Sequence, residues 1–209
     1  KRCGVTDLVA ISAIGSLREE MAPTHFVAVD QFIDRTSGRV QSFFGEGLVA
    51  HVALGHPVCG RLGDAVEEAC KEVGIDAVRG GTYLAMEGPQ FSTVAESNLY
   101  RSWGCDVIGM TNMPEAKLAR EAEMCYATVA MVTDFDCWHP DHDHVTVEAI
   151  IKVLQENAEK GRTLVKQVAP NPTDRTETCS HGCHTALEHA LITAPDAREE
   201  RPTGPNTFL

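Results

Sequence analysis

Short apolar runs alternate with stretches of helical periodicity along most of the chain. Strands are predicted where apolar, often β-branched residues run together and a glycine, a proline or a polar turn follows. These runs cover residues 7–12, 25–32, 82–86, 106–110 and 125–132. Helices are predicted where apolar residues recur every three or four positions, over 62–73, 94–103, 111–124, 147–168 and, in the tail, 185–192. This alternation predicts an α/β fold with a mixed, mostly parallel central sheet flanked by helices.

Two of these elements have distinctive patterns. Residues 125–132 are apolar throughout, as expected for a strand that is covered on both faces. The long helix 147–168 has an apolar stripe that is predicted to face the core. That stripe consists of Val147, Ile150, Ile151, Leu154, Ala158, Leu164 and Val168.

Ligands of such sheets bind outside the carboxyl ends of the strands. The residues that follow the predicted strands are therefore the candidates for a site. They are residues 12–16, 87–92, 110–112 and 133–137.

Asp134 and Asp136 are two residues apart at the end of the apolar strand. If extended geometry continues, both carboxylates point to one face, and mutual repulsion lets the pair hold one shared proton. Such a pair can donate one hydrogen bond and accept another, which suits a nitrogen heterocycle with an adjacent amino group. The alternative is that they cap a turn or bind solvent.

Ser12 and Thr111 are hydroxyls near a glycine or a helix start, where free backbone amides suit an oxyanion such as phosphate. Their alternative role is helix or turn capping. Phe91 lies in the loop Glu87-Gly88-Pro89-Gln90-Phe91-Ser92, where it either stacks on a flat ligand or plugs the core.

Composition narrows the function further. The 209 residues predict one domain, 1–209, with a poorly specified tail over 171–209. The formal charge of −12 excludes a general polyanion binder, so no nucleic-acid partner is expected. No apolar run is long enough for a membrane span, and the eight scattered cysteines suit reduced core thiols, so a cytoplasmic location is expected.

Two histidine-rich segments could suggest metal. Cys179-Ser180-His181-Gly182-Cys183-His184 offers thiols and imidazoles, but its spacing makes a cramped chelate, so no metal is expected; packing or a tail disulfide are the alternatives. His139, Asp141, His142, Asp143 and His144 are interpreted as a solvated loop or gate. A metal-dependent hydrolase would require these clusters to bind an ion.

Several motifs together resemble the trimeric purine nucleoside phosphorylase superfamily, in its 5'-methylthioadenosine phosphorylase branch. They are Gly15-Ser16-Leu17-Arg18-Glu19-Glu20, Asp30-Gln31-Phe32-Ile33-Asp34-Arg35-Thr36, Glu87-Gly88-Pro89-Gln90-Phe91-Ser92, Met110-Thr111 with Pro114-Glu115, and Thr133-Asp134-Phe135-Asp136-Cys137-Trp138. They occur in unbroken order up to about residue 170. Aspartate at both 134 and 136 favours the methylthioadenosine branch, because relatives that act on 6-oxopurines usually carry asparagine at the first position.

The resemblance implies phosphorolysis of 5'-methylthioadenosine to adenine and 5-methylthioribose 1-phosphate, with phosphate as co-substrate and no cofactor. Asp134, with Asp136, would bind N7 and the 6-amino group and supply the proton. Ser12, the backbone of Ala13 and Thr111 would hold phosphate. The remaining substrate contacts would be Phe91, Ser92, Met110, Val147, Ile150 and Ile151, with His51 reaching a neighbouring site in a homotrimer.

The sequence departs from this family at its start. Members carry an opening portion with a glycine-rich phosphate loop and an Arg-His pair, which this sequence does not show. A partial record of a longer protein is therefore expected. Two alternatives stay open: a phosphorylase for 6-oxopurine nucleosides or methylthioinosine, and a catalytically impaired purine-binding trimer module.

Overall fold

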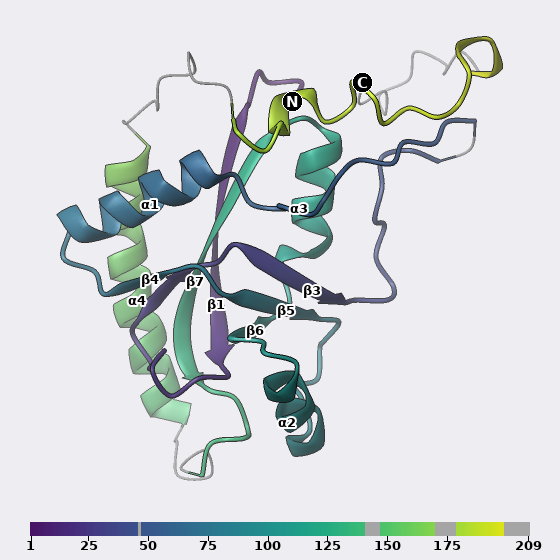
Figure 1. Cartoon of the computed structure of the whole chain (residues 1–209). Coiled ribbons are helices and arrows are strands. Elements are labelled where there is room, and N and C mark those ends of the chain that lie inside the picture. Colours follow the sequence, from purple (N-terminus) through teal and green to yellow (C-terminus); the bar gives the residue numbers. More distant parts are fainter. Residues whose placement is uncertain (46, 141–146, 170–178, 199–209) are drawn as a thin grey trace.

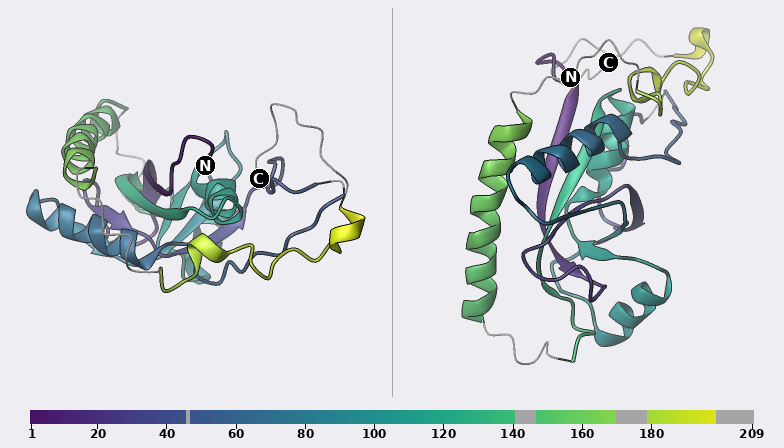
Figure 2. Two further views of the ribbon diagram at one scale, coloured as in Figure 1. Left: turned by 90° about the horizontal axis from the view of Figure 1, so that it is seen from above. Right: turned by 60° about the vertical axis from the view of Figure 1, so that its left-hand side comes forward.

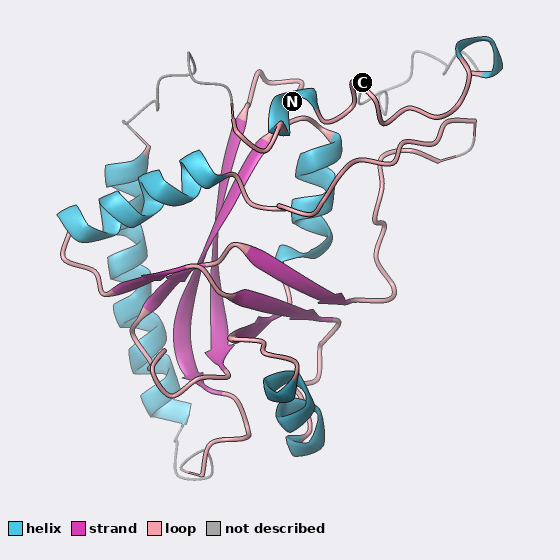
Figure 3. Ribbon diagram, viewed as in Figure 1, coloured by secondary structure: helices cyan, strands magenta, loops and turns pink. Residues whose placement is uncertain are grey.

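Seven strands form one mixed sheet (Figure 1, Figure 3). The computed structural model describes residues 1–45, 47–140, 147–169 and 179–198. The strands are β1 (Asp7–Ser16), β2 (Phe26–Ala28), β3 (Gln31–Arg35), β4 (Ala77–Arg79), β5 (Thr82–Met86), β6 (Val107–Gly109) and β7 (Cys125–Phe135). Their order is β3-β5-β6-β1-β7-β2-β4. Only the β1–β6 and β2–β7 pairs are antiparallel, which confirms the predicted mixed, mostly parallel sheet.

The sheet bends sharply at two connections between consecutive strands, from β2 to β3 and from β4 to β5. The single strand predicted over 25–32 is instead β2 and β3. β3 is one edge of the sheet and β2 lies next to the other edge, although only Val29 and Asp30 separate them in the chain. β4 and β5 follow the same bend beside them, through Gly80 and Gly81. Both glycines have positive φ, at 91° and 119°, a conformation that side-chain-bearing residues rarely adopt. The bend could not be predicted from an apolar run alone.

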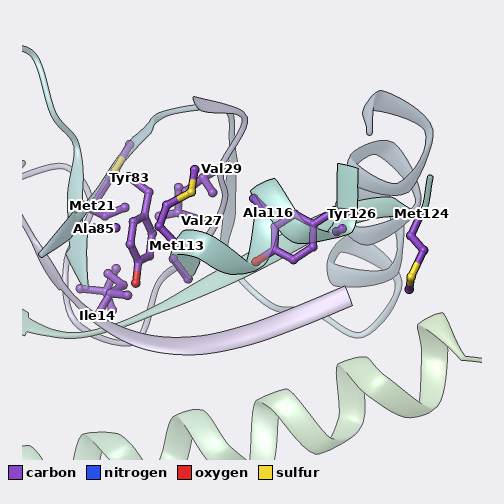
Figure 4. Packing of buried hydrophobic residues seen from close by; sticks show 14 of the residues in the cluster. Ile14, Met21, Val27, Val29, Tyr83, Ala85, Met113, Ala116, Met124 and Tyr126 are labelled. Carbon is purple, nitrogen blue, oxygen red and sulfur yellow. The ribbon is translucent and has the colours of Figure 1, made fainter. Parts of the chain in front are cut away.

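Helices cover both faces of the long central strands (Figure 2). They are α1 (Gly60–Glu72), α2 (Val94–Ser102), α3 (Asn112–Glu121) and α4 (Val147–Val168). α1 and α4 pack on one face with β2 and β7, whereas α3 packs on the other. On α3's side the core includes Ile14, Tyr83, Met113 and Tyr126 (Figure 4). Successive residues of β7 point to opposite faces, so an apolar strand serves both cores, as predicted.

Two helix predictions need correction. The predicted helix over 185–192 is absent: in the described tail a short 3₁₀ helix, Cys183–Thr185, is followed by turns, and a second one, Pro195–Ala197, comes later. The predicted inward stripe of α4 holds at Leu164, which is buried, but Ile151 and Leu154 are 48% and 43% exposed. The buried positions along this part of the helix are instead Asn157 and Gly161. Among the described residues, no helix is both long and apolar enough to cross a membrane.

Candidate active site

Two hydroxyls predicted to bind phosphate lie side by side. The Oγ atom of Ser12 is 2.8 Å from Oγ1 of Thr111. The predicted strand end at Ser12 was wrong, because β1 continues to Ser16. β6 runs antiparallel to β1, with Gly15 opposite Ile108, and this crossing brings residues 110 and 111 back along β1 to Ser12. The pair is therefore made by strand pairing and not by two neighbouring strand ends.

Thr111 stands at the start of α3, but its side chain makes no capping hydrogen bond. The capping alternative for this hydroxyl is therefore wrong in this structure. The next residue, Asn112, is fully buried and donates from Nδ2 to the hydroxyls of Tyr126 and Thr128. Tyr126 in turn donates to Glu115 over 2.8 Å. Burial, with the neighbouring Glu115 carboxylate, raises the pKa of Tyr126, so this phenol stays a hydrogen-bond donor. The network holds the start of α3 in place beneath Thr111.

The acid pair lies against Gly15 at the far end of β1. The pairing of β1 with β7 shifts between Ile14 and Gly15, so that Gly15 stands opposite Asp134. Such a bulge redirects the side chains that follow it. A Cβ atom added at Gly15 would lie 3.3 Å from Oδ1 of Asp134 and 3.6 Å from Cβ of Asp136. Both acids therefore approach the same point of β1.

The two acids differ in their surroundings. Oδ2 of Asp134 is 2.7 Å from the Thr133 hydroxyl. Asp136 is only 8% exposed, and its Oδ2 is buried without a hydrogen-bond partner in the described part of the chain. A buried carboxylate oxygen that lacks a donor is costly, and a ligand N–H group would satisfy it. The backbone N–H of Asp136 donates to the Ser16 carbonyl over 3.1 Å, which joins the main chain at Asp136 to the end of β1.

Aromatic side chains surround the end of β7. Trp138 donates from Nε1 to the Ser16 carbonyl over 2.9 Å, and the Arg101 guanidinium lies 3.6 Å from the centre of its ring. The rings of Phe135 and His139 stack at 4.4 Å. These contacts pack the segment that carries Asp136 against the end of β1. Residues 141–144 of the predicted His/Asp loop lie outside the described residues.

The loop after β5 supplies Phe91 and Ser92. Phe91 is 82% exposed, so the interpretation that it plugs the core is wrong. The backbone carbonyl of Ser92 accepts a hydrogen bond from Cys137 over 3.3 Å, which joins this loop to the segment with the acids. An exposed phenylalanine beside that segment is available to a flat ligand.

Sequence reasoning missed Arg39. Its guanidinium donates to the backbone carbonyls of Met110 and Met113, at 2.5 and 2.6 Å. It also donates to the carbonyls of Met86 and Glu87. Arg39 thereby joins the end of β5 to the start of α3 and sets the position of Met110. It lies in a polar, glycine-rich segment, and no local pattern marks it as different from a solvated arginine.

In the described residues, the remaining predicted substrate contacts are not connected with the hydroxyl pair or the acid pair. Val147 and Ile150 belong to the first turns of α4, but their side chains lie outside the described set. The exposed Ile151 follows on the same helix. His51 is exposed and its backbone N–H donates to the Ala190 carbonyl, so its segment pairs with the tail. In Figure 1 this segment and the tail lie away from the carboxyl ends of β1 and β7.

A hollow of about 410 Å³ lies elsewhere, at the beginning of β1 and along α3. Leu8, Phe43, Leu118 and Met124 are among the residues that line it, and no predicted site residue does. The hydroxyl pair and the acid pair, which lie on one strand, remain the better candidate for chemistry.

Comparison with known proteins agrees with this geometry. The profile of the phosphorylase superfamily matches residues 1–170. The chain belongs to the phosphorylase superfamily. It is 63% identical over 198 residues to the S-methyl-5'-thioadenosine phosphorylase of Rhodospirillum rubrum, covering 95% of this chain and 67% of that one. The Cereibacter sphaeroides S-methyl-5'-thioadenosine phosphorylase is 62% identical, with 95% and 69% covered.

Solved structures within the superfamily have the same fold. A methylthioadenosine phosphorylase from an antarctic soil metagenomic library superposes with a TM-score of 0.88 at 45% identity, covering 94% of this chain and 69% of that one. An adenosine/methylthioadenosine phosphorylase from Schistosoma mansoni, in complex with adenine, gives 0.77 at 30% identity, with 81% and 67% covered. The resemblance seen in the sequence motifs is confirmed. The chain spans about two thirds of the length of these relatives.

Proposed function

We propose that this chain cleaves 5'-methylthioadenosine with inorganic phosphate to adenine and 5-methylthioribose 1-phosphate. Its relatives at 62–63% identity are S-methyl-5'-thioadenosine phosphorylases. One structural observation carries the proposal: the Ser12–Thr111 hydroxyl pair and the acid pair at Gly15 lie on the same strand. Ser12 and Gly15 are three residues apart, about 10 Å along an extended strand. That separation is comparable with the length of a nucleoside.

The phosphate end of the site would use Ser12, Thr111 and the backbone of Ala13. Hydroxyls donate to phosphate oxygens, and Ala13 is exposed on β1 beside Ser12. Met110 precedes Thr111 and so would lie between phosphate and base, against the sugar. Phosphate held there attacks the anomeric carbon while the bond to the purine breaks. Phosphate is a substrate in this proposal, and no cofactor takes part in the chemistry.

The purine end would use Asp134 and Asp136. As the glycosidic bond breaks, negative charge builds on the purine ring, and a proton delivered to N7 neutralises it. Asp134 would hold that proton and Asp136, whose Oδ2 lacks a donor within the described chain, would accept from the 6-amino group. Phe91 and Ser92 would line the base, and Val147, Ile150 and Ile151 the methylthio group. A 6-oxopurine offers no amino donor to Asp136.

Parallel phosphorolysis assays test this function. Purified protein should release adenine from 5'-methylthioadenosine only when phosphate is present. It should cleave methylthioinosine and inosine far more slowly, because sites built for a hydrogen bond discriminate by up to about 10⁴-fold. Equal or faster cleavage of the hypoxanthine nucleosides would replace the proposal with the 6-oxopurine alternative. Calorimetric binding of methylthioadenosine without any phosphate-dependent turnover would instead identify a purine-binding module.

We also propose a homotrimer in the cytoplasm, in which His51 reaches a neighbouring site. The His51 side chain is exposed while its backbone is held by the tail, which leaves the imidazole available to another subunit. The described cysteines form no disulfide, as suits a reducing compartment. Sedimentation equilibrium should give three times the chain mass. A monomer that retains full activity would contradict the role of His51.

A further inference from the structure

Four cysteines from three distant parts of the chain meet at the start of β7. Cys59 directly precedes α1, Cys125 is the first residue of β7, and Cys179 and Cys183 lie in the tail. All four are buried, and their sulfur atoms all lie within 4.8 Å of one another. The distance between the sulfurs is 3.5 Å for Cys59 and Cys179, and 3.2 Å for Cys179 and Cys183. In Figure 1 the tail passes over the start of α1 at this point.

These spacings fit a single tetrahedral metal ion. Four thiolates at the usual zinc–sulfur distance of about 2.3 Å are about 3.8 Å from one another. A disulfide needs its sulfurs at about 2.05 Å, well below the 3.2 Å between the sulfurs of Cys179 and Cys183. An iron–sulfur cluster encloses several irons and needs its ligand sulfurs farther apart than these lie. Four sulfurs in a tetrahedron are typical of zinc.

The surroundings supply positive charge and amide donors. Arg120 is 4% exposed, and within the described chain it bonds to the carbonyls of His56 and His181. A buried cation of this kind requires a nearby anion. Arg61 lies beside Cys125, and its Nη1 is buried without a hydrogen-bond partner in the described residues. Four thiolates around a divalent cation carry two negative charges; Arg120 would offset one of them, and Arg61, which also pairs with Asp7, would offset part of the other.

Backbone donors lie close to one of the ligand sulfurs. The backbone N–H groups of His181 and Cys183 are directed at the sulfur of Cys179. Backbone N–H groups directed at a ligand sulfur are the outer contacts that orient metal ligands.

We propose that Cys59, Cys125, Cys179 and Cys183 together bind one zinc ion with a structural role. This departs from the expectation of no metal, which considered ligands only within single short segments of the chain. The tail histidines do not join the cluster, since His181 stacks on His56 at 4.5 Å and His184 is exposed. Four protein sulfurs complete a tetrahedron and leave no position for a substrate, as in structural zinc sites.

The ion would fasten the tail to the sheet. Beyond Cys183 the tail pairs with residues 49–51, through a bridge between Ala50 and Leu191 and hydrogen bonds at His51 and Val49. The described tail has little apolar contact of its own, because its buried residues are Cys179, Cys183 and Ala190. A zinc ion would thus hold in place the tail, which pairs with the segment containing His51.

Metal analysis of the purified full-length protein, expressed with zinc in the medium, tests the proposal. We expect about one zinc per chain, falling at least about tenfold in Cys183→Ser, because loss of one ligand opens the tetrahedron. The matched control is Cys70→Ser, which removes another buried thiol outside the cluster and should keep the zinc. Cys179→Ser removes the other tail ligand and serves if Cys183→Ser fails to fold. Cobalt replacement should give the intense visible bands of a tetrahedral thiolate site.

Three results would overturn the proposal. Eight titratable thiols with no bound metal would show a cluster of free thiols. Fewer than eight thiols in the denatured, unreduced and metal-free protein would show disulfides. Iron in place of zinc at one per chain would show that the choice of metal is wrong. Activity is not used as a readout, so the test is independent of the proposed function.

Discussion

The residues that meet at the two ends of β7 differ in their separation along the sequence. Cys125 begins the strand and Asp134 lies nine residues later, about 30 Å away in extended chain. At the carboxyl end, two acids come from one short segment and meet Gly15 of the adjacent strand. At the amino end, four cysteines come from residues 59, 125, 179 and 183. A local sequence motif therefore indicates the acid pair, whereas only folding brings the four cysteines together.

Asp134→Asn should have the largest effect on activity, and this effect should be confined to the site at the carboxyl end of β7. We expect kcat/KM for methylthioadenosine to fall by about 10²–10⁴, because the amide cannot deliver a proton to N7. Cleavage of 6-oxopurine nucleosides should fall much less, and zinc content and melting temperature should not change. Asp64→Asn, with its side chain 75% exposed on α1, is the control. An equal loss on both substrate classes would contradict the assigned role.

Thr111→Ala should act on phosphate and leave the purine end intact. A hydrogen bond to a charged group is worth about 1.5–3 kcal/mol, so the KM for phosphate should rise roughly tenfold to hundredfold. KM for the nucleoside should change little. Because the two hydroxyls touch, the effects of Ser12→Ala and Thr111→Ala on phosphate KM should not add in the double variant. An unchanged phosphate KM in initial-rate kinetics would remove Thr111 from the site.

Gly15→Ala should test whether β1 sets the position of the acids. Its new methyl group would lie 3.3 Å from both Oδ1 of Asp134 and Cγ2 of Ile108, so a neighbour must move by a few tenths of an ångström. A displacement of this size should lower kcat/KM about tenfold. The control is Gly55→Ala, where a methyl group meets nothing within 4 Å. Equal kcat/KM values for the two variants would show that the acids tolerate the displacement.

Arg39→Met should have the smallest effect on chemistry and a measurable one on stability. The variant leaves the carbonyls of Met110, Met113, Met86 and Glu87 without their donor. We expect the free energy of unfolding in urea to fall by about 2 kcal/mol, and the nucleoside KM to rise a few-fold. Arg162→Met, on the exposed face of α4, should cost about 0.5 kcal/mol or less. If both variants lose the same stability, Arg39 does not hold Met110 in place.

Local chemistry explains which elements were predictable. The strand predicted over 82–86 and the helix predicted from 94 match the structure closely. The ends of the helix are marked locally, by a capping box at Thr93 and Glu96 and by Gly104, which has positive φ. The end of β1 was missed because glycine usually ends a strand. Here Gly15 continues it, since it pairs with β7, and the close approach of Asp134 leaves little room for a side chain at this position. The helix predicted over 185–192 was wrong, because pairing of the tail with residues 49–51 competes with helix formation.

The sequence by itself determined the α/β class, the family and the acid pair, because periodicity, turn residues and a two-residue spacing act over a few positions. Only the tertiary structure decided that Ser12 meets Thr111, that Arg39 joins two strand ends and that four cysteines share one place. Those contacts depend on antiparallel pairing of β1 with β6 and on a tail folded back over α1. Such pairings join residues tens of positions apart, and the free energy that selects them comes from burial of the whole core.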